Sequence, residues 1–327
     1  MAFQPPRWLR GAHLQSTLDS LPPRHGWARQ RAAGLLAGAQ ELLLDCGQGV
    51  RLQGWHSAPP HSGAAPRALR LAVLLHGWEG SAESSQVLSV GALLLERGYQ
   101  VLRLNLRDHG ATHHLNREIF HSCRLPEVVG ALNALRARFP AARLQLAGFS
   151  LGGNFVLRAA ANPAAPAGIA CAAAVSPVLD PAATLLALEQ TWPLYRRFFV
   201  WRWSASLRRK QHAWPDEHDF EPLLQLADLR AMTAALVKTS TDFPNLEAYL
   251  EGYALTGRRL ESLRVPARLL LAEDDPMIPA AGLARLAHPE GLEILQTRFG
   301  GHCGFIDRLR APSFADRWIV EQFERYC

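Results

Sequence analysis

The residues best suited to chemistry lie in the run GFSLG at 148–152, which has the pattern G-x-S-x-G. The apolar run at 143–147 is typical of a buried strand, and the Ala-rich run at 153–161 is typical of a helix. A serine on a sharp strand-to-helix turn projects its Oγ above the sheet, and the crowded backbone there requires small neighbours. The two glycines meet this requirement, so the pattern predicts a nucleophile elbow with Ser150 as the nucleophile.

Partners for such a serine follow it along the chain. An elbow serine needs a general base and a carboxylate that orients the base, and these follow in the order acid, histidine. Two neighbouring acids, Asp274 and Asp275, follow the apolar run 267–272, and His302 lies in a glycine-rich turn after the run 292–299. Asp275 is preferred as the acid because the D-P-x-x-P run that it begins resembles the usual acid loop of hydrolases with this elbow. Asp274 is the alternative.

A serine that attacks a carbonyl group also needs N–H donors for the oxyanion that forms. With this elbow, one donor is the backbone N–H after the nucleophile, here that of Leu151, and the other comes from the loop after the third strand. The run HGWEG at 76–80 makes Trp78 the simplest choice for the second donor. The Trp78 side chain either lines an acyl pocket or packs under a cap. We expect His76 to orient this loop through hydrogen bonds and not to act as a base.

Strand and helix patterns alternate along most of the chain. Short apolar runs predict strands at 40–46, 51–57, 69–75, 99–106, 143–147, 169–175, 267–272 and 292–299. Helical spacing predicts further helices at 84–97, 125–139, 280–287 and 306–325, and 59–66 is predicted to be a loop. This alternation predicts an α/β fold, with a mostly parallel central sheet and helices on both of its faces.

Two segments depart from this alternation. Residues 178–263 are predicted to form a helical cap insertion. Residues 1–38 are rich in Pro, Arg, Gly and Trp without clean periodicity, so we expect an irregular N-terminal arm. The whole chain, 1–327, is expected to be a single domain, because α/β folds of this size often carry insertions.

The formal net charge of +6 is local. Residues 192–210 contain six Arg or Lys and no acid, so the rest of the chain balances 29 bases against 29 acids. A broad basic face for nucleic acid is therefore not supported. Trp192–Trp203 also mixes aromatic residues with arginines. We interpret it as a cap helix with its arginines in water; weak contact with an anionic membrane surface is the alternative.

Composition also bounds the compartment and the cofactors. The five cysteines are scattered and form no CxxC pair, and the N-terminus lacks an apolar signal region, so we expect a soluble cytoplasmic protein. The histidines at 109–121 lack paired carboxylate or cysteine spacing, which favours a solvated or loop-bracing role over metal binding. Neither a cofactor nor a metal is expected, since Ser, His and backbone dipoles supply the chemistry.

Several motifs together resemble a known family. GAHLQS near the N-terminus, HGWEGS, LNLRDHG, GFSLGGN, EDDP and GGHCGF span almost the whole chain. They resemble those of the α/β-hydrolases of the YheT-like branch, which includes bacterial proteins assigned as esterases and related eukaryotic acylglycerol lipases, phospholipases and ethyl-ester synthases. The resemblance implies an α/β-hydrolase fold with Ser150, Asp275 and His302 as catalytic residues. Relatives commonly carry a glycine-rich turn where this chain has Asp108-His109-Gly110, so that loop either contacts substrate or braces the site.

These observations favour a serine hydrolase of carboxylic esters, either short- to medium-chain acyl esters or monoacylglycerols. The expected partner is a small-molecule acyl ester, and the sequence does not define an oligomeric state. Two alternatives stay open: an acyltransferase that uses an alcohol as acceptor, and a non-catalytic ligand-binding protein on the same fold.

Overall fold

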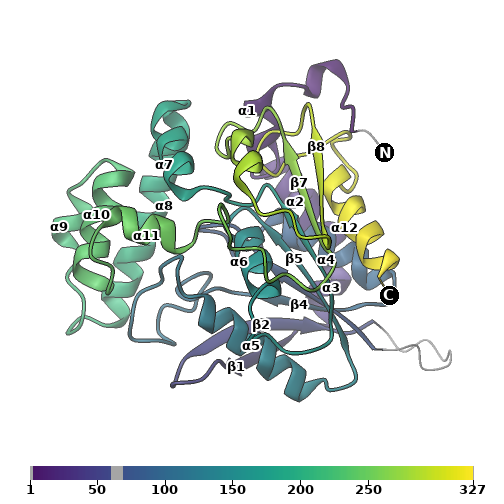
Figure 1. The fold of residues 1–327 in the computed structure, drawn as a ribbon, viewed down its shortest axis with the longest axis horizontal. Coiled ribbons are helices and arrows are strands. Elements are labelled where there is room, and N and C mark those ends of the chain that lie inside the picture. The colour runs from purple at the N-terminus through teal and green to yellow at the C-terminus, as the bar shows by residue number, and fades with distance from the viewer. Residues whose placement is uncertain (1–2, 60–68, 327) are drawn as a thin grey trace.

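The computed structural model describes residues 3–59 and 69–326 as one central sheet with helices on both faces (Figure 1). Eight strands lie in the order β1-β2-β4-β3-β5-β6-β7-β8. Their bounds are β1 (Gln40–Asp45), β2 (Arg51–Ser57), β3 (Arg70–Leu75), β4 (Gln100–Leu104), β5 (Arg143–Phe149), β6 (Ile169–Val175), β7 (Ala267–Ala272) and β8 (Leu292–Thr297). All eight predicted strands are present, with ends that shift by two residues at most.

Strand direction brings the loops that carry the site motifs to one edge of the sheet. β1 and β2 are antiparallel to their neighbours, whereas β4, β3, β5, β6, β7 and β8 are mutually parallel. In the register, Leu75 at the end of β3 lies opposite Gly148 near the end of β5. The loops after β3, β5, β7 and β8 therefore meet at the carboxyl ends of the strands, where ligands bind in open α/β sheets.

The sheet separates two layers of hydrophobic core. Along β3, Leu71 and Val73 face one layer while Ala72 and Leu74 face the other, as the two-residue period of a strand requires. One layer packs under α5 and α6 and the other under α4 and α12. These helices are α4 (Ser85–Glu96), α5 (Leu125–Arg138), α6 (Leu151–Ala160) and α12 (Phe314–Arg325).

A group of helices lies between β6 and β7 and stands apart at one end of the molecule (Figure 1). It comprises α7 (Pro181–Gln190), α8 (Pro193–Ala213), α9 (Glu221–Leu224), α10 (Leu229–Ser240) and α11 (Leu246–Gly252). We call this group the cap. These helices fall within residues 178–263, where the sequence predicts a helical cap insertion. No helix in residues 3–59 or 69–326 is long and apolar enough to cross a membrane.

The prediction of an irregular N-terminal arm is wrong. This part of the chain forms a short 3₁₀ helix, η1 (Arg7–Leu9), and three α-helices, α1 (Ala12–Leu18), α2 (Pro22–Arg31) and α3 (Ala33–Ala37). The helices are short and bury polar side chains such as Gln15 and Arg24 beside small apolar groups, so no apolar period marks them. Pro22 and Pro23 occupy the first turn of α2, where proline favours a helix start.

Two C-terminal elements are shorter than predicted. Residues 280–287 form only a 3₁₀ helix, η2 (Ala280–Arg285), because Leu286 has an extended backbone. The last helix begins at Phe314, not at residue 306, because Ser313 and Asp316 form a capping box there. Most of the loop predicted at 59–66 lies outside the described residues.

Candidate active site

Ser150 lies at a strained turn between β5 and α6. Its φ of 52° falls in the left-handed region that non-glycine residues seldom adopt. A Cβ on Gly148 would lie 2.3 Å from the carbonyl oxygen of Gly152, and a Cβ on Gly152 would lie 2.3 Å from that of His76. Only glycine fits at both places, which is the physical reason for the spacing seen in the sequence. The strain is held by packing around a turn that presents the hydroxyl at the strand edge.

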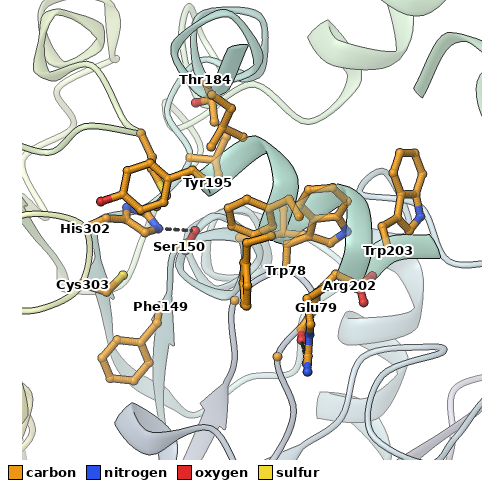
Figure 2. A pocket seen from close by; sticks show the side chains of 18 of the residues that line it. Trp78, Glu79, Phe149, Ser150, Thr184, Tyr195, Arg202, Trp203, His302 and Cys303 are labelled. Carbon is orange, nitrogen blue, oxygen red and sulfur yellow. Dashed lines mark hydrogen bonds between the residues drawn. The ribbon is translucent and has the colours of Figure 1, made fainter. Parts of the chain in front are cut away.

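A chain of hydrogen bonds joins the three predicted polar side chains. His302 Nε2 lies 2.9 Å from Ser150 Oγ, and His302 Nδ1 lies 2.9 Å from Asp275 Oδ2. Figure 2 shows the imidazole pointing at the hydroxyl from the opposite loop. Asp275 lies 27 residues and Ser150 lies 152 residues before His302 in the sequence. The carboxyl ends of the parallel strands bring these three side chains together.

The two neighbouring aspartates have different partners. Asp275 turns one oxygen to His302, while the other accepts hydrogen bonds from the backbone amides of Met277 and Ile278, both at 2.9 Å. Asp274 accepts instead from the backbone amide of Gly301 at 2.8 Å. Asp275 therefore orients the imidazole, and Asp274 helps to hold the turn that carries it.

The charge of Asp275 also sets the proton affinity of the imidazole. Burial by itself lowers the pKa of His302, but the negative charge and hydrogen bond of Asp275 oppose this and raise that pKa well above its usual value. The carboxylate thus stabilises the imidazolium form, which is the form that a histidine reaches after taking a proton from serine.

The loop at 76–80 lies beside the serine. Gly77 packs against Ser150, since a Cβ added to Gly77 would lie 3.3 Å from Ser150 Cβ. The Trp78 amide belongs to the next residue of the loop. Leu151 begins α6, and the amides of a first helical turn have no acceptor within the helix. Both predicted N–H donors thus belong to backbone next to Ser150.

Two neutral histidines brace this loop. His76 donates from Nδ1 to the Gly77 carbonyl and accepts at Nε2 from the Leu106 amide. His109 donates from Nδ1 to the Arg107 carbonyl and accepts at Nε2 from the Glu79 amide at 3.1 Å. Burial lowers the pKa of His76 to about 4 and holds that of His109 well below its usual value. The structure thus gives His76 the orienting role predicted for it.

Arg107, Asp108 and His109 directly after β4 brace the site and are not among the residues that line its cavity. Arg107 forms a buried ion pair with Glu127, and Asp108 forms another with Lys210 of α8 at 3.0 Å. Lys210 also donates to the backbone carbonyl of Glu118 at 2.9 Å. This segment therefore fixes the cap to the sheet, which answers the question that Asp108-His109-Gly110 left open.

A cavity of about 1040 Å³ opens beside Ser150 and His302. Leucines of the cap line one part of it: Leu185, Leu188, Leu229, Leu236 and Leu250. Polar side chains from the N-terminal segment and from the start of α4 also line it: Ser20, His25, Ser84, Ser85 and Gln86. The cavity can hold a molecule with one apolar and one polar portion next to the serine hydroxyl.

Aromatic side chains join the loop at 76–80 to the cap. The Trp78 ring stacks on Phe199 of α8 with centroids 5.2 Å apart, and it meets Trp203 edge-on at 5.4 Å. Trp78 also lines the cavity (Figure 2), so both roles considered for its side chain hold. Arg202 of α8 donates to the Glu79 carbonyl.

Sequence reasoning gave no role to three residues that contact the site. Ser16 Oγ accepts from the His302 amide at 2.8 Å, and Gln15 forms three hydrogen bonds to Leu9 and Ile306. Tyr195 of α8 lines the cavity and bonds to the His13 side chain at 3.0 Å. Gln15 and Ser16 end the GAHLQS motif, so the sequence carried a signal for two of them.

The described residues offer no cluster of three His, Cys, Asp or Glu side chains arranged to hold a metal ion. His113, one of the histidines considered as a ligand, instead bonds to Ser206 of the cap at 2.9 Å. What the site does hold is a serine that a histidine can deprotonate, with a carboxylate behind the histidine. Such an arrangement can add the serine oxygen to an electrophilic carbonyl or phosphoryl centre.

Comparison with known families agrees with this geometry. Residues 72–309 match the family model described as the alpha/beta hydrolase fold. The chain is an α/β hydrolase. It is 27% identical over 325 residues to ABHD15 of Homo sapiens, covering 98% of this chain and 68% of that one. It is 25% identical over 316 residues to YheT of Escherichia coli (strain K12), covering 93% and 87%, and it belongs to the YheT-like branch of this α/β hydrolase family.

A lipase and an esterase are also similar to it. The monoacylglycerol lipase of Saccharomyces cerevisiae is 23% identical over 266 residues, which cover 78% of this chain and 58% of the lipase. The solved structure of the Pyrococcus furiosus esterase Pf2001 superposes with a TM-score of 0.58 at 17% identity, covering 88% of this chain and 91% of the other, and shows the shared fold. The family match and these similarities agree on an α/β-hydrolase fold.

Proposed function

We propose that this α/β hydrolase cleaves carboxylic esters through an acyl-enzyme on Ser150. The observation that carries the proposal is the hydrogen-bonded chain from Ser150 through His302 to Asp275, with 2.9 Å at each step. An elbow serine, a histidine within reach of its hydroxyl and a buried carboxylate behind that histidine are the parts that acyl transfer requires.

In the first half-reaction, Ser150 Oγ bonds to the carbonyl carbon of the ester while His302 Nε2 takes the hydroxyl proton. The resulting imidazolium gives this proton to the alcohol oxygen as the carbon–oxygen bond of the ester breaks. Water then attacks the acyl-enzyme with His302 again as the base, which releases the acid and restores the serine. Asp275 stays ionised throughout and stabilises the imidazolium.

The tetrahedral oxyanion is proposed to bind the amides of Trp78 and Leu151. The loop that carries Trp78 is fixed by His76, by His109 and by Arg202, so its amide needs no rearrangement during the reaction. Preorganised donors of this kind are worth about 10²–10³ in rate each.

The cavity supports acyl esters with an apolar chain. Leucines of the cap supply an apolar lining, and the nearby hydroxyl groups and His25 can meet a polar alcohol portion. The similarity to a monoacylglycerol lipase agrees with a substrate that has an apolar acyl chain and a polar alcohol portion. We propose short- to medium-chain acyl esters, monoacylglycerols among them, as the substrate class.

The test is hydrolysis of a p-nitrophenyl ester series from acetyl to palmitoyl, with Ser150→Ala as the matched control. The proposal expects a rate that peaks at one chain length and falls in the variant by a factor of about 10⁴ or more. A fluorophosphonate probe should label the wild type once and leave Ser150→Ala unlabelled. Equal, negligible rates without labelling of the folded wild type would favour a non-catalytic ligand-binding protein.

A further inference from the structure

Helix α8 buries polar side chains and exposes apolar ones. Its buried positions are Tyr195, Trp203, Ser204, Ser206, Leu207 and Lys210. Its outward side instead carries Leu194, Phe198 and Trp201, whose exposed fractions are 48%, 46% and 63%. Large apolar side chains on the outward side depart from the pattern that a helix on a water-facing surface normally shows.

The exposed apolar side chains share one face of α8. Leu194, Phe198 and Trp201 follow one another at spacings of four and three, so they lie on one side of the helix. Phe198 and Trp201 are in ring contact at 6.4 Å. At the amino end of α8, Trp192 is also exposed and contacts His13 of α1 at 5.6 Å, which extends the apolar surface toward α1.

Basic side chains surround this apolar surface. Arg197 and Arg208 are exposed on the same side of α8, and Arg209 is exposed next to them. Within the described part of the chain, none of the three forms an ion pair. The segment 192–210 contains no acidic residue that could offset them. We call Leu194, Arg197, Phe198, Trp201 and Arg208 the apolar-basic face.

We propose that the apolar-basic face docks on an anionic lipid surface. Aromatic rings and leucine enter the headgroup boundary of a bilayer, while arginines at their side meet the negative charge of the lipids. A second copy of this chain placed on the same face would bring like charges together, which disfavours that occupant.

The face also adjoins the entrance to the cavity. Leu194 and Phe198 line the cavity while they are about half exposed to solvent, so they belong to both surfaces. From Trp201, ring contacts run through Phe198 and Phe199 to Trp78 beside the serine. Docking would bring the cavity entrance to the lipid surface. Delivery of an ester from the lipid into the cavity rests on the proposed function, whereas docking itself does not.

Vesicle flotation of the full chain tests the docking without any use of activity. Vesicles of phosphatidylcholine alone are compared with vesicles that contain about one third phosphatidylglycerol. The proposal expects binding to the anionic vesicles that weakens as salt is added. Trp201→Gln and the double variant Arg197→Gln/Arg208→Gln should each lower the partition coefficient about tenfold.

Matched controls separate this face from general surface hydrophobicity. Leu43 on the edge strand β1 is 50% exposed, close to the value for Leu194, so Leu43→Gln is compared with Leu194→Gln. Only Leu194→Gln should weaken vesicle binding, while circular dichroism should show all variants folded. Trp201 does not line the cavity, so Trp201→Gln should still hydrolyse a soluble ester if the proposed function holds.

Three results would overturn the docking proposal. The first is equal binding to neutral and anionic vesicles, and the second is binding that none of the face variants changes. The third is a dimer, detected by light scattering, that Trp201→Gln converts to monomer while the wild type ignores vesicles. That last result would assign the face to a second copy of the chain.

Discussion

Asp274 and Asp275 are adjacent in the chain, yet only one of them orients the imidazole. Asp275 faces His302 Nδ1, and its second oxygen is fixed by two backbone amides. Asp274 accepts from the Gly301 amide, and burial raises the pKa of its carboxyl group. The two carboxyl groups therefore differ in where their oxygens point, and only Asp275 points at the imidazole.

Amide substitution at each aspartate separates these roles. Asp275→Asn removes the negative charge and favours the wrong imidazole tautomer, so kcat should fall by about 10³–10⁴. Asp274→Asn keeps an oxygen that can accept from Gly301, so kcat should fall less than about tenfold. Steady-state kinetics on a p-nitrophenyl ester measure both. Losses of equal size would contradict the assignment of Asp275.

The pH profile tests the charge of Asp275 directly. A histidine must be neutral to accept the serine proton, so kcat/KM should rise with pH as His302 loses its proton. Because Asp275 raises the pKa of His302, removal of its charge should lower that pKa. We expect the acid limb of the Asp275→Asn profile to lie at lower pH than that of the wild type. NMR titration of the His302 ring checks the same shift, and an unmoved midpoint would be inconsistent with this coupling.

At the scale of elements, the elbow depends on the close approach of α6 to β3. A Cβ on Gly152 would lie 2.3 Å from the His76 carbonyl oxygen and 2.5 Å from that of Leu75, and backbone atoms cannot give way as side chains do. Gly152→Ala should therefore lower the free energy of unfolding by about 3 kcal/mol or more.

Gly26→Ala in the middle of α2 is the matched substitution. A Cβ there meets no atom within 4 Å, so the variant should gain about 0.5–1 kcal/mol from its higher helix propensity. Urea unfolding of both variants gives the comparison. A Gly152→Ala protein as stable as Gly26→Ala would show that the turn tolerates a side chain.

Elements built from local signals were predictable from the sequence. β6 and β7 match the predicted ranges 169–175 and 267–272, because each is a mostly apolar run with a parallel strand on either side. The capping box of α12 was also present in the sequence, at Ser313 and Asp316. The helix predicted to begin at residue 306 begins at Phe314 instead, because the apolar Ile306 is buried in the preceding loop and not in the helix.

Elements held by distant contacts were not predictable. Gln15 and Arg24 look like surface residues in the sequence, but both are buried because they donate to carbonyls near residues 306–311. Partners nearly 300 residues away leave no local pattern. The same limit applies to the site: spacing and order predicted Ser150 and His302, but not the support that Ser16 gives to the histidine loop.

At the scale of the whole molecule, the N-terminal helices join the histidine loop to the cap. Ser16 of α1 accepts from the His302 amide, and His13 on the same helix bonds to Tyr195 of α8. Arg24 of α2 donates to the carbonyls of Arg308, Leu309 and Ala311 beyond the histidine loop. The segment predicted to be irregular thus links two parts of the chain that surround the cavity.

Gln15→Leu tests whether this link matters to the reaction. Gln15 is fully buried, and its side chain satisfies the Leu9 carbonyl and both backbone groups of Ile306. Leucine would leave these three groups without partners, at a cost of about 1–3 kcal/mol each. The free energy of unfolding should therefore fall by at least about 3 kcal/mol. Since Ile306 closes the loop that carries His302, kcat should also fall, with KM changed less.

Gln30→Leu is the control, because Gln30 is exposed on α2 and the same substitution there removes no buried partner. Thermal unfolding and steady-state kinetics are compared for the two variants. Gln30→Leu should match the wild type in both. If Gln15→Leu loses stability but keeps full kcat below its unfolding temperature, the N-terminal helices stabilise the fold without positioning His302. A loss of kcat in the folded variant would make the N-terminal helices part of the structure that holds the imidazole against the serine.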